Sequence, residues 1–307
     1  MREIDETTAN LFDHLDALRI IGEDRAAKKY IYSFLVPEDS EDEYWFPDPR
    51  MASGNDPDMT LLCYGPELTE ETVSLSYEYG IFPWFGYQDA DMPRWHAPLD
   101  RFVLFPEEIH VSHSMRTLLN SRRYKVSFNK AFSDVIEACR TVDGRDSMEG
   151  AWLSNDIKEI YSRLSEKGKA GSVEVWDTHD GDRLVGGLYG IITNNGNFIG
   201  ESMFSRVPSA SKVALIALAR KMAEESGNER LIDLQIETPH LKSMGGRHIG
   251  YYDYLSIINP EKARMIDPEF IPPFRLHKED RQPAIEITDF TPKLLRIVAP
   301  RQRKYDE

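Results

Sequence analysis

The stretch LVGGLYGIITNNGNFIGESMF, residues 184–204, decides the predicted fold. Its two apolar halves are separated by Asn195-Gly196, a dipeptide typical of the tight turns between antiparallel strands. We therefore expect a β-hairpin at this place. The alternating segment SVEVWD (172–177) precedes the hairpin and ends shortly before another glycine turn, which predicts a third strand beside it.

The segments that flank these strands predict an α+β fold with a mixed sheet. Residues 209–226 carry apolar side chains at helical spacing, and residues 231–236 (LIDLQI) have the composition of a buried strand. Two earlier helices are expected, one capped by Asn129 and one capped by Ser154. Helices and strands in this order, without a regular alternation of the two, are typical of α+β proteins.

The chain divides into four expected regions. Residues 1–58 combine an acidic extension, with a helix at 8–21, and a linker rich in proline and aspartate. Residues 59–125 are expected to form a small N-terminal α/β domain. Residues 126–258 contain the hairpin and form the main domain, and residues 259–307 form a C-terminal extension rich in proline and charge.

Composition restricts the class of protein. The chain has 307 residues, 41% of them hydrophobic, and only two cysteines, which excludes a cysteine metal cluster. The acidic N-terminus is unlike a secretory signal, and no apolar run approaches the roughly 20 residues of a membrane span. We expect a cytoplasmic protein without membrane association, and a monomer. His110 and His113 lack a third ligand nearby, so no metal site is expected.

Charge is distributed unevenly along the chain. The formal net charge is −15, and residues 1–93 carry all of this excess, with 21 acidic and 6 basic residues. Residues 94–130 have a local charge of +4, which suits a nucleic-acid backbone, although a solvated basic surface is the simpler interpretation. The candidates for contacts with the phosphates of a nucleic acid are Arg101, Arg116, Arg122, Arg123 and Lys125.

Polar side chains interrupt apolar strands at three positions. Glu201 lies within GESMFS, and Asp233 and Gln235 stand two residues apart in LIDLQI, which predicts that both face the same side. Buried polar groups cost free energy unless they are paired. The three residues therefore indicate either a satisfied hydrogen-bond network or a polar site at the mouth of an apolar pocket.

Several sequence blocks together resemble the leucyl/phenylalanyl-tRNA–protein transferase family, in order and spacing, from about residue 61 to 258. The resemblance implies a GNAT-like N-acyltransferase fold for the main domain and a small domain before it. The blocks are YGIFPWF (79–85), VLFPEEIHVSHSMRTLL (103–119), EGAW (149–152), SVEVW (172–176), LVGGLYG (184–190), GESMFSRVPSASKVAL (200–215) and LIDLQIETPHLKSMGGRHI (231–249).

The resemblance also implies an activity. Leu or Phe, and Met weakly, would pass from aminoacyl-tRNA to proteins that begin with Arg or Lys, creating a degradation signal without any cofactor. Asp233 and Gln235 would lie next to the reacting ester, and Glu201 would orient the substrate. The substrate-binding set would comprise Trp84 and Trp152 for the terminal adenosine of tRNA, Ser205, and a side-chain pocket of Leu188, Phe198, Leu215, Leu218 and Met222.

A mechanism follows from the chemistry of the substrates. The ester of aminoacyl-tRNA is already activated, so positioning can supply most of the rate. We expect Gln235 to accept a hydrogen bond from the attacking amine and Asp233 to fix the Gln235 amide, with Gln235 or the ribose 2′-hydroxyl taking the proton.

Two alternatives to this activity compete. One is an acyl-CoA N-acetyltransferase, disfavoured because the turn at residues 206–211 lacks glycine and contains a proline. The other is a non-catalytic module that binds RNA or protein, which would not need Asp233 and Gln235.

Overall fold

The computed structural model describes residues 44–47, 49, 60–64, 68–84, 93–142, 155–225, 229–266 and 294–297. The expected helix at 8–21 and the candidate Trp152 lie outside these residues. Within the described residues, no helix combines the length and the apolar composition that crossing a bilayer requires.

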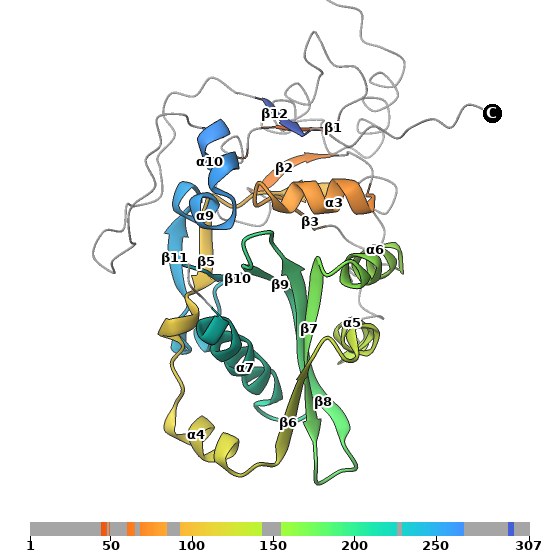
Figure 1. Cartoon of the computed structure of the whole chain (residues 1–307), viewed down its shortest axis with the longest axis vertical. Helices are drawn as coiled ribbons and strands as arrows, with labels where there is room; N and C mark the ends of the chain where they lie inside the picture. Colours follow the sequence, from red (N-terminus) through yellow and green to blue (C-terminus); the bar gives the residue numbers. More distant parts are fainter. Residues whose placement is uncertain are drawn as a thin grey trace, which may run out of the picture.

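A seven-stranded mixed sheet forms the centre of the molecule, with the order β11-β5-β10-β9-β8-β7-β6 (Figure 1). Neighbouring strands are antiparallel except β9 and β10, which are parallel. The predicted α+β class with a mixed sheet is therefore confirmed. The strands are β5 (Asp100–Leu104), β6 (Tyr124–Phe128), β7 (Ala170–Asp177), β8 (Arg183–Ile192), β9 (Phe198–Ser205), β10 (Ile232–Gln235) and β11 (Arg247–Gly250).

The predicted hairpin is formed by β8 and β9. Gly196 lies in the connecting turn with a φ of 75°, a conformation that favours glycine, and the Thr193 amide donates to the Asn197 carbonyl. Gly186 of β8 has a different role, because a Cβ atom there would lie 2.5 Å from the Ala210 side chain. The missing side chain lets the following helix pack directly on the sheet.

Helices cover both faces of this sheet. Helix α7 (Ala210–Glu225) packs on one face, whereas α5 (Phe132–Thr141) and α6 (Asn155–Glu166) pack on the other (Figure 1). The helix expected to be capped by Asn129 begins later, with Ala131 at its N-cap. Asn129 instead has a φ of 55° and accepts a hydrogen bond from the Ser172 amide.

A smaller layer lies against one end of the large sheet. Its strands are β2 (Leu61–Tyr64), β3 (Phe82–Pro83) and β4 (Arg94–His96), in the order β2-β4-β3. Helix α3 (Glu70–Tyr77) accompanies them and begins at the predicted Thr69 cap, whose side chain accepts from the Thr72 amide. A separate pair, β1 (Tyr44–Pro47) and β12 (Leu294–Ile297), joins segments from the two ends of the chain.

The two domains expected on either side of residue 125 are not separate in the central sheet. The expected boundary at residue 125 falls within β6, and β5, which belongs to the expected small domain, lies between β10 and β11. The two expected domains thus contribute strands to one sheet. The connecting elements are η3 (Pro106–Glu108), α4 (His113–Asn120), α8 (Pro239–Ser243), α9 (Tyr251–Ile258) and α10 (Pro260–Ile266).

Candidate active site

An apolar cavity of about 350 Å³ lies where β9 and β10 separate. The two parallel strands pair only at Phe198 with Ile232 and at Ile199 with Asp233. The residues that follow on both strands line the cavity together with α7 and α8. The lining consists of Leu188, Phe198, Gly200, Glu201, Ser202, Met203, Leu215, Leu218, Ile232, Asp233, Leu234, Gln235, Ile236, Thr238, His240 and Leu241.

Four of the five predicted side-chain pocket residues line this cavity. They are Leu188, Phe198, Leu215 and Leu218. The fifth, Met222, is buried in the core beneath α7 and is absent from the cavity wall. Met203, which the sequence reasoning missed, lines the cavity instead. It pairs with Leu188 across the hairpin, so the predicted hairpin contained the signal that could have found it.

Ser205 has a structural position outside the cavity wall. Its hydroxyl donates to the Val207 carbonyl at 2.8 Å and accepts from the Ser211 amide at 3.3 Å. These bonds fix the turn between β9 and α7. Ser205 therefore supports the helix that carries part of the pocket and does not contact the cavity.

The polar end of the cavity centres on Glu201, which is 9% exposed. Its carboxyl group accepts hydrogen bonds from the hydroxyl of Tyr77 at 2.6 Å and the hydroxyl of Tyr161 at 3.2 Å. The side-chain amide of Gln235 also donates to it, at 3.2 Å. Helices α3 and α6, on the far side of the sheet from α7, thus hold a carboxyl group that reaches the cavity. Sequence reasoning missed both tyrosines.

Burial raises the pKa values of Glu201, Tyr77 and Tyr161. Desolvation raises the pKa of Glu201 from 4.5 to about 7, although the hydrogen bonds from Tyr77 and Tyr161 oppose the shift. Burial and the nearby Glu201 carboxylate raise the pKa values of both tyrosine hydroxyls well above 10. Both tyrosines therefore stay protonated and act as hydrogen-bond donors to Glu201 at neutral pH.

Asp233 and Gln235 lie together at the end of β10, but not as predicted. The backbone amide of Gln235, and not its side chain, donates to an Asp233 carboxylate oxygen at 2.9 Å. The regular pairing of β10 with β5 shifts between the two residues, and Gln235 has a φ of 60°. Both residues line the cavity; Asp233 is fully buried and Gln235 is partly exposed. The backbone leaves the extended conformation at Gln235, where the strand turns.

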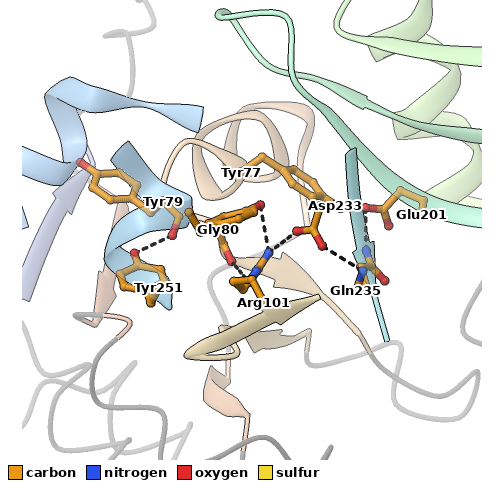
Figure 2. Close-up of polar contacts among 9 residues, drawn as sticks. Tyr77, Tyr79, Gly80, Arg101, Glu201, Asp233, Gln235 and Tyr251 are labelled. Atoms are coloured by element: carbon orange, nitrogen blue, oxygen red, sulfur yellow. Dashed lines mark hydrogen bonds and ion pairs between the residues drawn. The ribbon is translucent and has the colours of Figure 1, made fainter. Parts of the chain in front are cut away.

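Arg101 is the partner of Asp233. Figure 2 shows its guanidinium between the Gly80 carbonyl and Asp233, with Gln235 on the other side of Asp233 and next to Glu201. The Arg101–Asp233 ion pair is 2.6 Å long, and Arg101 is only 2% exposed. Burial opposes the charge of Arg101, but the Asp233 carboxylate outweighs it and raises the pKa of the guanidinium above its usual value. A side chain this buried cannot reach a tRNA phosphate, so we withdraw Arg101 from the expected tRNA-binding set.

The sequence profile of the family described as Leucyl/phenylalanyl-tRNA protein transferase matches residues 103–259, about half of the chain. The matched range includes Glu201, Asp233 and Gln235. The chain belongs to this family.

Individual members of the leucyl/phenylalanyl-tRNA protein transferase family support the assignment. A protein of this name from Chromohalobacter salexigens is 46% identical over 220 residues, which cover 69% of this chain and 82% of that protein. Another from Flavobacterium psychrophilum is 43% identical over 198 residues, covering 64% and 90%. A third, from Shewanella baltica, is 37% identical over 223 residues, covering 73% and 89%.

The side chains expected to contact tRNA lie in different parts of this transferase family member. Trp84 is partly buried just after β3, and its ring forms a T-shaped pair with the His96 ring, with the ring centres 5.4 Å apart. The exposed side chains of Arg116 and Arg122 lie on and just after α4, at the opposite end of the molecule from α3 (Figure 1). Arg123 lies just before β6 and pairs with Asp177 at 2.7 Å. Lys125 lies within β6, and its ammonium is 3.9 Å from Asp182.

The described part of this transferase family member contains no group of three or more His, Cys, Asp or Glu side chains arranged to hold a metal ion. His110 and His113, the pair considered from the sequence, are exposed.

Proposed function

We propose that this protein transfers Leu or Phe, and Met weakly, from aminoacyl-tRNA to the N-terminal α-amine of proteins that begin with Arg or Lys. The observation that carries this proposal is the cavity of about 350 Å³, apolar at Leu188, Phe198 and Leu215 and bounded at one end by Gln235 and Glu201. An apolar side chain that is not branched at Cβ, such as that of Leu, Phe or Met, fits such a cavity. A charged side chain would lose its hydration there without gaining a partner.

The geometry supports a specific role for Gln235. Because its side-chain nitrogen donates to Glu201, its carbonyl oxygen is the end available to accept a hydrogen bond from a substrate. In the proposed reaction this oxygen accepts from the attacking α-amine and holds it against the ester carbon. The new amide bond forms as the ester bond to the 3′ oxygen breaks. The amine proton reaches that oxygen by way of Gln235 or the ribose 2′-hydroxyl.

Glu201 and Asp233 keep this arrangement rigid. Glu201 fixes the orientation of the Gln235 amide, and Asp233 fixes the backbone from which the Gln235 side chain extends. The α-amine has an ordinary pKa near 8, so a useful fraction is neutral at pH 7 without a strong base. Positioning of the amine, more than acid–base power, therefore accounts for the rate.

We further propose a GNAT-like fold for the main domain, with aminoacyl-tRNA and a basic protein N-terminus as the partners. The mixed sheet and the separation of its parallel strands β9 and β10 around the cavity support this fold. No cofactor enters the reaction. The product, with a new bulky N-terminal residue, would act as a degradation signal.

The test is direct transfer of radiolabelled Leu from charged tRNA to a peptide that begins with Arg. Acetyl-CoA is the matched donor control, because an N-acetyltransferase would use it. Transfer from Leu-tRNA but not from acetyl-CoA is the expected result. Acetylation would replace the proposal with the acyl-CoA alternative, and binding without transfer would replace it with a non-catalytic module.

A further inference from the structure

Gln235 occupies a strained backbone position. The Ile236 amide donates to the Leu234 carbonyl at 2.8 Å, and Gln235 between them has a φ of 60°. This is a three-residue γ-turn of the positive-φ kind, which side chains other than glycine adopt rarely and at a cost. A strained turn persists only where its surroundings hold it. The direction of the Gln235 side chain therefore depends on what restrains this turn.

Asp233 restrains the turn from one side. One oxygen of its carboxylate accepts from the Gln235 amide at 2.9 Å, and the other accepts from the Arg101 guanidinium at 2.6 Å. Asp233 is fully buried, so water does not compete for either oxygen. Its orientation is consequently set by Arg101, the charged group that faces it.

Two elements hold Arg101 in turn, the loop after α3 and helix α9 (Figure 2). Its Nη1 donates to the Gly80 carbonyl at 2.8 Å, which follows α3. Its Nη2 donates to the Tyr254 hydroxyl of α9 at 3.0 Å, and the guanidinium lies 4.1 Å from the centre of the Tyr254 ring. The Tyr251 hydroxyl, which also belongs to α9, donates to the Tyr79 carbonyl at 2.7 Å and secures the same loop.

We propose that Arg101 is a positioning residue for aminoacyl transfer, which it serves by orienting Asp233 and so fixing the Gln235 turn. The inference rests on the proposed function. Arg101 does not itself line the cavity; it acts through Asp233, which does. Lysine cannot replace it, because one ammonium group lacks the planar fork that spans Gly80 and Asp233.

The chain offers a matched control in Arg247. This arginine is also buried, at 8% exposed, and its Nε donates to Glu108 at 2.9 Å. Its guanidinium lies 4.1 Å from the centre of the Phe105 ring, the same distance as in the Arg101 contact with Tyr254. Both residues lie on neighbouring strands of one sheet, but Arg247 has no bond to Asp233 or Gln235 among its described contacts.

The experiment compares Arg101→Lys with Arg247→Lys. Melting temperature, kcat and the KM for Leu-tRNA are measured with an Arg-initiated peptide. We expect both variants to melt lower, but only Arg101→Lys to lose kcat, by about 10- to 100-fold, as displaced reacting groups do. The KM for Leu-tRNA should change less than about twofold, because the interaction acts on the transition state.

Defined outcomes overturn the inference. It is wrong if Arg101→Lys keeps the wild-type kcat, or if both variants lose kcat equally in proportion to their stability. If Arg101→Lys does not fold, Tyr254→Phe decides, since it removes one hydroxyl bond to Arg101 and keeps the ring. A several-fold loss of kcat then supports the inference, and an unchanged kcat refutes it. Failure of the wild-type protein to transfer Leu refutes the proposed function itself.

Discussion

The side-chain amide of Gln235 donates to the carboxyl group of Glu201 across 3.2 Å, and this contact assigns the two ends of the amide different roles. The nitrogen is held by Glu201, while the oxygen is left for a ligand in the cavity. Glu201 can hold the amide because Tyr77 and Tyr161 hold Glu201. The carbonyl oxygen of Gln235 is thus an oriented hydrogen-bond acceptor at the end of an apolar cavity.

Glu201 should make stability depend on pH. Its pKa rises from 4.5 in the unfolded chain to about 7 in the folded protein, so the folded state binds the additional proton between these values. The stabilisation is fully present below pH 4.5 and is lost as the pH rises toward 7, which amounts to a few kcal/mol. Urea unfolding of wild type and Glu201→Gln from pH 5 to 8 measures this. The variant should lose most of the downward slope, and equal slopes would contradict the assignment.

The Arg101–Asp233 pair should separate stability from activity. Asp233→Ala leaves a buried arginine without its counter-charge, which costs about 3–5 kcal/mol. The double substitution Arg101→Met/Asp233→Leu replaces the pair with apolar side chains and should recover most of the free energy of unfolding. Transfer activity should stay low in both variants, because neither fixes the Gln235 turn. Recovery of activity together with stability in the double variant would show that the pair is only structural.

Leu218 should help set the choice between amino acids. Leu218→Phe adds bulk to the cavity wall and should favour Leu over Phe by about tenfold, within the range that apolar pocket shape provides. Met222→Leu is the matched control on the same helix, since Met222 is buried outside the cavity. Competition between Leu-tRNA and Phe-tRNA for one peptide measures the ratio. An unchanged ratio in Leu218→Phe, or an equal change in both variants, would place the substrate side chain elsewhere.

The surface formed by Arg116 and Arg122 should bind the tRNA backbone without reading its sequence. Charge reversal at both positions should raise the KM for aminoacyl-tRNA at least tenfold, and the effect should weaken as salt rises. Arg163→Glu on the exposed side of α6 is the control for a change of net charge. The melting temperature should stay unchanged in each case. A KM that does not respond to salt in the wild-type protein would exclude this surface as the binding site.

Local periodicity allowed β7, β8, β9, β10, the central hairpin and the α7 helix to be predicted, whereas the pocket residues were expected from the family resemblance. Four of those five pocket residues line the cavity, but Met222 continues the helical face beyond its end. Met203 lines the cavity from the position opposite Leu188 on β9, but it was not among the expected residues. The cavity is bounded by the separation of β9 and β10, which no local pattern reveals.

The contacts that hold the polar site lay beyond sequence reasoning. Tyr77 and Tyr161 reach Glu201 from positions 124 and 40 residues away in the chain. Arg101 was counted with the surface cations, because a charge count cannot distinguish a buried arginine from an exposed one. The turn at Gln235 was missed since strand alternation assumes that the backbone stays extended.

The proposed role of the Gln235 carbonyl oxygen in holding the attacking amine is tested most directly by the single-turnover rate of Leu transfer by wild type and Gln235→Asn. Asparagine tolerates positive φ better than glutamine, so the variant should be as stable as wild type or more stable by up to about 1 kcal/mol. Its shorter side chain withdraws the carbonyl oxygen, so the rate should fall by about 100-fold while Leu-tRNA affinity is unchanged. A Gln235→Asn protein that transfers Leu at the wild-type rate would contradict the account.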